Sequence, residues 1–358
     1  MTRPWRRTRA LLGPLLTPLY AAAIARRNAR FDRGRGVSRA ALPVISIGNL
    51  STGGTGKTPF VMWLARALRA HAFVPAIAMR GYASAHGLSD EADEYRRALP
   101  DVPVIVNPDR AAGIAAFLAA QDAESGSISQ AHPALRPTHI ILDDGFQHRR
   151  LARDADIVLI DATRDPRRDH FLPRGDLREP LSSLRRAHAI ILTRCQQAAP
   201  AALDDLEHAL RAAAPAALIL RARSELTAFR LEPAGTPLEP ADLRARRILA
   251  LSAIGNPAAF LAHLHAALGN PDPALIRELA LPDHDLFTDA TINRAIAAAR
   301  NHRADFIIAT EKDWSKLARI PASRWPAPLA IALSRTVITT ADEAALLALI
   351  LARCAARV

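Results

Sequence analysis

The sequence predicts an α/β fold: a P-loop NTPase-like, mostly parallel sheet with helices on both faces, and a smaller C-terminal α/β domain. Three observations favour it. Short apolar runs alternate with segments long enough for helices, as in parallel sheets. A glycine-rich loop follows the first run, and a pair of aspartates follows a later one. The expected strands lie near Val44, Val74, Val104, Ile140, Ile157, Ile190 and Leu218, and in the C-terminal domain near Ile248, Phe306 and Leu329.

The length indicates more than one domain. Single cores seldom grow beyond about 250 to 300 residues, and this chain has 358. A hydrophobic fraction of 50% with 23% charged residues excludes wholesale disorder. The expected parts are a basic, amphipathic N-terminal segment over 1–36, a P-loop domain over 37–221, a linker over 222–245 and the smaller α/β domain over 246–358. Two cysteines, Cys195 and Cys354, are too few for a disulfide framework and suit a reducing compartment.

The positive charge is concentrated at the N-terminus. The chain has a formal net charge of +12, and residues 1–36 hold nine arginines against one aspartate, which leaves only +4 for the rest. The basic stretch lacks an aromatic-interleaved recognition motif and the rest of the chain is nearly neutral, which argues against a nucleic-acid-binding protein. The charge therefore belongs to an N-terminal segment rather than to the whole molecule.

Sixteen uncharged residues between Arg9 and Arg26 allow three interpretations of this segment. It could be a secretory signal, a helix packed on the body with solvated arginines, or an interfacial segment that meets anionic lipid. Its length, together with Pro14 and Pro18, excludes a membrane-spanning helix. The motif described next argues against export, because an exported protein would lack ATP.

A phosphate-binding loop is the clearest motif. The apolar run 43–47 is followed by GNLSTGGTGKTP over 48–59 and then by a helical pattern. Strand, glycine loop and helix in this order are typical of a P-loop, whose backbone N–H groups bind phosphates at the helix N-terminus. The usual pattern has glycine where this chain has Ser51. The candidate nucleotide-binding residues are Gly53, Gly54, Thr55, Gly56, Lys57 and Thr58, with Lys57 on the β- and γ-phosphates and Thr58 on Mg²⁺.

Two adjacent aspartates indicate the metal end of the site. The apolar run 138–142 ends at Asp143 and Asp144. A strand that delivers carboxylates beside a P-loop is typical of Mg²⁺ binding, and two carboxylates next to a triphosphate would repel each other without a cation. Asp-Asp-Gly is also a common turn sequence, which is the alternative interpretation.

Together, GNLSTGGTGKTP and DDGFQHRRLARDADIVLIDA resemble the tetraacyldisaccharide 4′-kinase family. Further matching segments are RGY at 80–82, NPDR at 107–110, LPRGDLREP at 172–180, IGNP at 254–257, PDH at 282–284 and TEKD at 310–313. The resemblance implies transfer of the γ-phosphate of ATP to the 4′-hydroxyl of a tetraacyl disaccharide 1-phosphate, which gives lipid IVA in lipid A biosynthesis. It also implies a peripheral or monotopic location on the cytoplasmic face of the inner membrane.

The resemblance also implies roles for individual residues. Asp90 matches the family's catalytic aspartate, with Asp93 and Glu94 as neighbouring alternatives. His284 matches a histidine that assists this aspartate, with His148 as the alternative. The implied substrate ligands are Arg80, Tyr82, Arg110 and His148, and Glu179 is an additional candidate for Mg²⁺.

A second hypothesis comes from a different class. A P-loop ATPase that is not a kinase could act as a switch controlling membrane or partner binding. One such class, the partitioning ATPases, has a second lysine at the position of Thr52, and its absence argues against that class. The expected partners are thus ATP, an anionic acylated disaccharide lipid and the inner-membrane surface.

Overall fold

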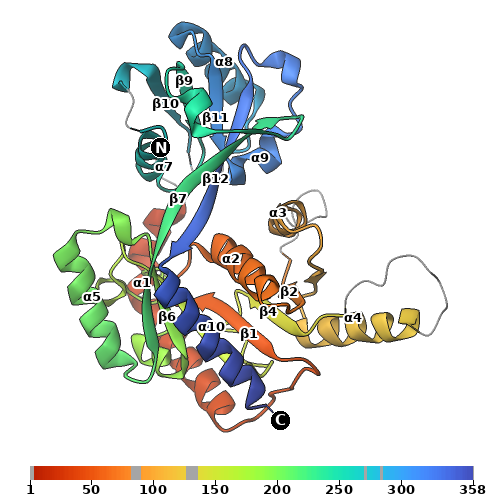
Figure 1. Ribbon diagram of the computed structural model, residues 1–358. Coiled ribbons are helices and arrows are strands. Elements are labelled where there is room, and N and C mark those ends of the chain that lie inside the picture. Colours follow the sequence, from red (N-terminus) through yellow and green to blue (C-terminus); the bar gives the residue numbers. More distant parts are fainter. Residues whose placement is uncertain (1–3, 82–89, 126–135, 270–271, 283–284, 358) are drawn as a thin grey trace. The chain divides into compact units, whose positions relative to one another are not determined.

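The computed structural model in Figure 1 describes residues 4–81, 90–125, 136–269, 272–282 and 285–357. The chain divides into two compact units, one formed by residues 1–223 with 338–358 and the other by residues 224–337. Two strands, β7 (Leu218–Glu232) and β12 (Leu329–Ile338), continue from one unit into the other along the chain.

A parallel sheet forms the centre of the first unit. Its strand order is β7-β6-β5-β1-β4-β2-β3, and every neighbouring pair is parallel. The bounds are β1 (Val44–Asn49), β2 (Pro75–Met79), β3 (Val104–Val106), β4 (His139–Asp143), β5 (Ala155–Asp161) and β6 (Ala189–Thr193). All residues of β1, β2, β4, β5 and β6 are buried, which is why these strands are continuous apolar runs in the sequence. The predicted α/β fold is confirmed.

Helices cover both faces of this sheet. Successive side chains of a strand point to opposite faces. On β5, Ile157 and Leu159 pack with α2 (Lys57–Ala70), α3 (Asp90–Ala98) and α10 (Thr340–Ala355), whereas Val158 and Ile160 pack with α5 (Pro200–Ala213). Further along the sheet, α4 (Arg110–Ser125) lies on the second face through Ile114 and Leu118. Short 3₁₀ helices lie at Pro166–Arg168, Leu181–Arg186 and Cys195–Gln197.

The C-terminal helix corrects the expected domain boundaries. Residues 338–358 belong to the first unit and not to a domain over 246–358. The apolar stripe of α10 includes Leu346, Leu347 and Ile350. These side chains are buried in the same core as those of α2 and the sheet of the first unit. An amphipathic helix has the same sequence pattern whichever sheet it covers, so the chain returns to the first unit without a signal in its sequence.

The segment 222–245 is also not a linker. Strand β7 runs through its first half to Glu232 and pairs with β8 (Thr236–Leu238) in an antiparallel hairpin, and α6 (Pro240–Leu243) follows. The segment looked like a linker because it is rich in charge and proline. In the structure, its charged residues include exposed positions of β7, and a tight turn joins β7 to β8.

The second unit has its own parallel sheet. Its order is β10-β9-β11-β12, with β9 (Ile248–Ser252), β10 (Ile276–Ala280) and β11 (Phe306–Thr310). Its helices are α7 (Pro257–Ala267), α8 (Asp289–His302) and α9 (Glu311–Leu317), with 3₁₀ helices at Pro273–Leu275 and Ala322–Arg324. Strand β10 was not expected from the sequence, because only its first residue is buried and the segment IRELA is not a continuous apolar run.

The N-terminal segment forms a long helix, α1 (Pro4–Asp32), with Pro14 and Pro18 inside it. Within the described part of the chain, no helix combines the length and the apolar character that crossing a membrane requires. The helix belongs to the first unit, and its contacts there are part of the candidate site.

Candidate functional site

The loop between β1 and α2 has the backbone of a phosphate cradle. Gly53 and Gly56 adopt φ values of 107° and 84°, a left-handed conformation that favours glycine. Gly56 immediately precedes α2 and has no side chain with which to cap it, so the first N–H groups of the helix face the loop. Such N–H groups, at the positive end of a helix, bind anions.

Neighbouring side chains hold this loop in place. The Asn49 amide donates to Thr55 Oγ1 at 3.0 Å, and the Thr193 hydroxyl donates to the Thr55 carbonyl at 2.9 Å. The Arg194 guanidinium donates to the Gly54 carbonyl at 2.6 Å. Because Thr55 is buried and bonded in this way, its side chain shapes the loop, and the backbone remains to bind phosphate. Asn49 and Thr193 end the buried strands β1 and β6, and Arg194 follows β6, but no motif in the sequence marks these three residues as part of the site.

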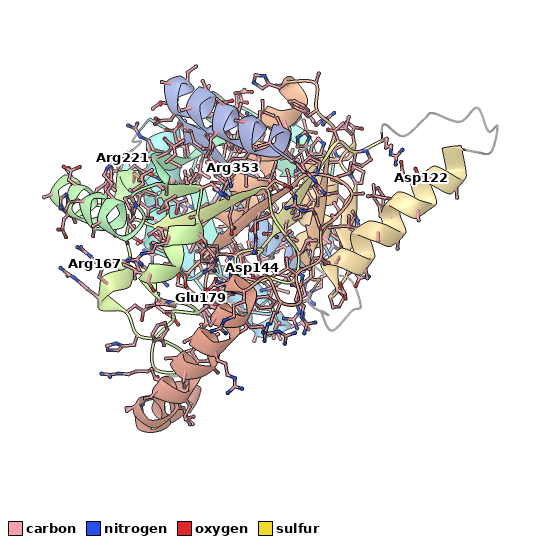
Figure 2. The ribbon with its side chains drawn as sticks, turned by 90° about the horizontal axis from the view of Figure 1, so that it is seen from below. Asp122, Asp144, Arg167, Glu179, Arg221 and Arg353 are labelled. Carbon is pink, nitrogen blue, oxygen red and sulfur yellow. The ribbon has the colours of Figure 1, made fainter. Side chains whose placement is uncertain are left out.

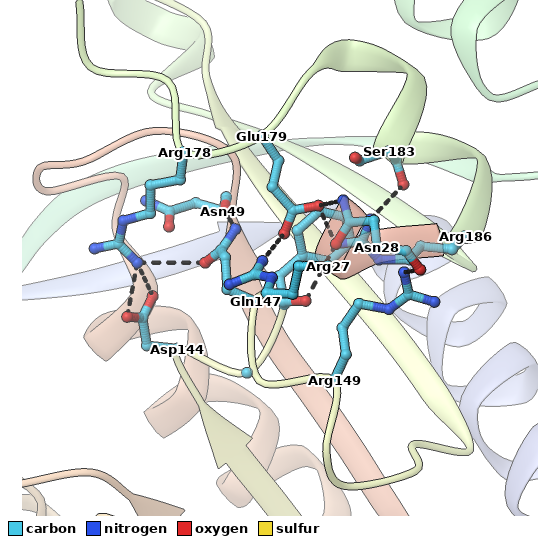
Figure 3. A network of polar contacts seen from close by, with 12 residues as sticks. Arg27, Asn28, Asn49, Asp144, Gln147, Arg149, Arg178, Glu179, Ser183 and Arg186 are labelled. Atoms are coloured by element: carbon cyan, nitrogen blue, oxygen red, sulfur yellow. Dashed lines mark hydrogen bonds and ion pairs between the residues drawn. The ribbon is translucent and has the colours of Figure 1, made fainter. Parts of the chain in front are cut away.

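Lys57 and Asp144 join the two motifs. Lys57 Nζ lies 3.5 Å from Asp144 Oδ1, and Arg178 donates to both oxygens of Asp144 at 3.0 and 2.8 Å (Figure 3). Burial raises the pKa of Asp144, but Lys57 and Arg178 more than offset this and hold the pKa below its usual range. The carboxylate is therefore ionised at neutral pH, beside the loop.

Asp143 is held from another side. It ends β4, is buried, and accepts a hydrogen bond from the Tyr95 hydroxyl at 3.1 Å. Tyr95 also shares a hydrogen bond with Thr58. Because the Thr58 hydroxyl and the Asp143 carboxylate both touch one phenol, they lie close together, and hydroxyl and carboxylate oxygens are ligands that suit Mg²⁺. The residues present therefore fit a magnesium ion.

Arg110, which is buried, pairs with the partly buried His148. Arg110 Nη1 lies 3.2 Å from His148 Nδ1, and a guanidinium can only donate, so Nδ1 accepts. Burial, followed by the charges of Arg110 and Arg153, lowers the pKa of His148 to about 4. At neutral pH the imidazole is neutral with its proton on Nε2, an atom shielded from solvent and without a hydrogen-bond partner among the described residues. The pair offers a donor to an oxygen atom of a ligand.

The remaining candidates stand at different places. Arg80 is exposed immediately after β2, at the same sheet edge as Asp143. Asp90 is the first residue of α3, and its side chain is outside the described part, as are Tyr82 and His284 entirely. The structure thus brings together Lys57, Thr58, Asp143 and Asp144, and it places Arg80 on their edge of the sheet.

Glu179 lies in a different environment from the one the sequence suggested. Its side chain is fully buried and accepts hydrogen bonds from Asn28 at 2.9 Å, Arg27 at 3.4 Å and Arg186 at 2.8 Å (Figure 3). These contacts satisfy the carboxylate with groups from α1 and the body, so nothing in its surroundings reserves it for Mg²⁺. Its neighbour Arg178 is the residue of this segment that contacts the aspartate pair. Figure 2 shows Asp144 and Glu179 near α1.

Replacing Glu179 by alanine should lower the free energy of unfolding by about 3 to 5 kcal/mol, because it removes the fully buried partner of two partly buried arginines, Arg27 and Arg186. Denaturant unfolding followed by circular dichroism measures this loss. Asp32→Ala is a matched control, since Asp32 also ties α1 to the body, through an ion pair with Arg149 at 2.7 Å, but is 65% exposed. Its removal should cost less than about 1 kcal/mol. Equal losses in both variants would contradict the special role of Glu179.

The loop, its lysine and the carboxylates on the adjacent strand define a P-loop nucleotide-binding protein. The family model for tetraacyldisaccharide-1-P 4′-kinase matches residues 8–354. Tetraacyldisaccharide 4′-kinases of Anaeromyxobacter dehalogenans (strain 2CP-C) and Porphyromonas gingivalis (strain W83) are 38% and 32% identical, over 87% and 85% of this chain and 84% and 85% of their own. A crystal structure of LpxK from Aquifex aeolicus in complex with ATP, 27% identical, covers 97% of this chain and 99% of its own, with a TM-score of 0.69. The chain belongs to the tetraacyldisaccharide 4′-kinase family.

Proposed function

We propose that this protein transfers the γ-phosphate of ATP to the 4′-hydroxyl of a tetraacyl disaccharide 1-phosphate, giving lipid IVA in lipid A biosynthesis. The observation that carries the proposal is the 3.5 Å contact between Lys57 of the P-loop and Asp144 at the end of the neighbouring strand. It places a phosphate-binding cation and metal-binding carboxylates together in a chain of this kinase family.

The chemistry requires few covalent tasks of the protein. The 4′-oxygen of the acceptor bonds to the γ-phosphorus while the bond from that phosphorus to the bridging oxygen breaks, and ADP leaves. The acceptor proton passes to a carboxylate, which we assign to Asp90, supported by His284. The loop N–H groups and Lys57 stabilise the charge on the phosphoryl oxygens. Thr58, Asp143 and Asp144 would hold Mg²⁺, which neutralises the triphosphate when bound.

Substrate ligands follow from the same assignment. Arg80 and Arg110 offer guanidinium groups, which match phosphate oxygens in charge and geometry. His148 adds a neutral donor next to Arg110. Together with Tyr82 they are the proposed contacts for the acceptor lipid and the transferred phosphate.

The direct test is incubation of the purified protein with Mg²⁺, ATP labelled in the γ-phosphate, and the tetraacyl disaccharide 1-phosphate. Label should appear in a lipid with two phosphates. If folded protein that binds ATP releases only free phosphate, the kinase proposal fails. The alternative, a P-loop ATPase that acts as a switch, then becomes the better explanation.

We also propose that α1 attaches the protein to the cytoplasmic face of the inner membrane, as a peripheral or monotopic protein. Leu16 and Leu19 of this helix are 45% and 67% exposed. Among the described side chains of the same helix, those of Arg26 and Arg30 are exposed. Apolar and basic side chains on one helix suit the boundary between anionic headgroups and acyl chains.

Two variants separate these contributions to membrane binding. Arg26→Gln/Arg30→Gln should weaken sedimentation with vesicles containing anionic phospholipid roughly tenfold or more, since each basic residue contributes about 1 kcal/mol near such a surface. Leu16→Ser/Leu19→Ser should weaken binding to anionic and neutral vesicles alike. ATP binding serves as the control and should not change. If both variants bind vesicles as well as the parent protein does, the proposal fails, and α1 is a helix that only packs on the rest of the first unit.

A further inference from the structure

Tyr95 stands out as a residue to which neither motif assigns a role. It lies in α3 and is fully buried, with its ring in the core that α2 shares with the sheet. Its hydroxyl donates to Asp143 Oδ2 at 3.1 Å and shares a hydrogen bond with Thr58. One phenol therefore contacts the last residue of the P-loop motif and the first of the aspartate pair. It is the lone aromatic residue in the otherwise charged or small stretch DEADEYRRA.

The direction of these hydrogen bonds matters. Tyr95 has one proton and donates it to Asp143, so Thr58 must donate to the Tyr95 oxygen. A phenol carries its proton at neutral pH, because tyrosine side chains ordinarily titrate at about pH 10. A hydroxyl that binds a cation uses an oxygen lone pair, and its own proton must point to another acceptor. Tyr95 is such an acceptor for Thr58.

We propose that Tyr95 is a positioning residue for Mg²⁺: it orients the Thr58 hydroxyl and the Asp143 carboxylate before Mg²⁺ and ATP bind. The inference rests on the proposed use of Mg²⁺ in the kinase reaction. Residues that orient metal ligands through hydrogen bonds contribute to metal affinity although they do not touch the metal. Tyr95 also ties these ligands to α3, which begins at Asp90, five residues and about 7.5 Å earlier along the helix axis.

Tyr95→Phe isolates the hydroxyl, because phenylalanine keeps the ring and the core packing. The affinity for Mn²⁺, used as a spectroscopic probe in place of Mg²⁺, is measured by electron paramagnetic resonance with a non-hydrolysable ATP analogue bound. We expect this affinity to fall by about 10- to 100-fold. Calorimetric binding of the same analogue in the presence of a chelator should change less than twofold. In turnover, kcat should fall at a fixed Mg²⁺ concentration and recover in part at higher Mg²⁺.

Leu99→Ala is the matched control. Leu99 follows α3 and is buried in the same core, but it has no polar group in contact with Asp143. This variant should lower the melting temperature and leave the Mn²⁺ affinity unchanged. Unchanged Mn²⁺ affinity in Tyr95→Phe, or an equal loss in Leu99→Ala, overturns the proposal.

A second measurement needs no substitution at position 95. Protein labelled with 3-fluorotyrosine gives one ¹⁹F resonance for each of its three tyrosines, and the Tyr20→Phe and Tyr82→Phe variants assign them. Adding Mg²⁺ to the complex with the ATP analogue should shift the resonance of Tyr95 and not that of Tyr20. A Tyr95 resonance that does not respond overturns the proposal. If the unsubstituted protein binds the analogue equally well with and without Mg²⁺ and transfers no phosphate to lipid, the proposed function itself fails.

Discussion

Lys57→Ala should lower the rate of phosphoryl transfer about 100- to 1,000-fold, the usual effect of removing one group that stabilises transition-state charge. The ammonium group sits at the start of α2, 3.5 Å from Asp144, where an incoming triphosphate would meet it. A single-turnover assay with saturating ATP and the acceptor lipid measures the chemical step directly. The loss should be in the rate constant and, to a smaller extent, in ATP affinity.

The structure predicts a second consequence of this change. Lys57 and Arg178 together hold the pKa of Asp144 below its usual range, against the effect of burial. Without Lys57 the pKa of Asp144 rises, so its carboxylate becomes protonated at a higher pH. The acid limb of the pH–activity profile should therefore shift to higher pH than in the parent protein.

Arg69→Ala provides the control for Lys57→Ala. It removes one positive charge from the other end of α2, where Arg69 pairs with the exposed Asp101 at 3.2 Å. This variant should retain activity within about twofold, because exposed ion pairs contribute little. Comparable losses in both variants would mean that the charge of the helix, and not the ammonium at the loop, supports transfer.

The sheet could be predicted from the sequence because parallel strands buried on both faces leave continuous apolar runs. Motif spacing likewise located Lys57 and the aspartate pair. The position of α10 could not be predicted, since its buried stripe is compatible with either sheet. This limit has a physical origin: local patterns report which side of an element is buried, not which partner buries it.

The same limit explains the site residues that sequence reasoning missed or placed differently. Tyr95 acts through Thr58 and Asp143, which are 37 positions before and 48 positions after it. Glu179 resembled a metal ligand, but its partners Arg27 and Asn28 come from a helix about 150 residues earlier. Hydrogen bonds between distant segments leave no periodicity in the sequence, so only the structure reveals them.

Asp90→Asn should reduce turnover by about 100- to 10,000-fold while ATP binding persists, because the amide keeps the size of the side chain but cannot take the proton of the acceptor hydroxyl. Asp93→Asn is the matched comparison: it is the same change on the same helix, in a residue whose carboxylate pairs with Arg96 at 3.0 Å. The Arg96 guanidinium already occupies this carboxylate, so we expect the Asp93→Asn variant to retain most activity. ATP affinity measured by calorimetry distinguishes a lost base from a lost nucleotide site. If Asp93→Asn is the more damaged enzyme and Asp90→Asn turns over normally, the proton passes to Asp93, and the first turn of α3 still supplies the base from a different position.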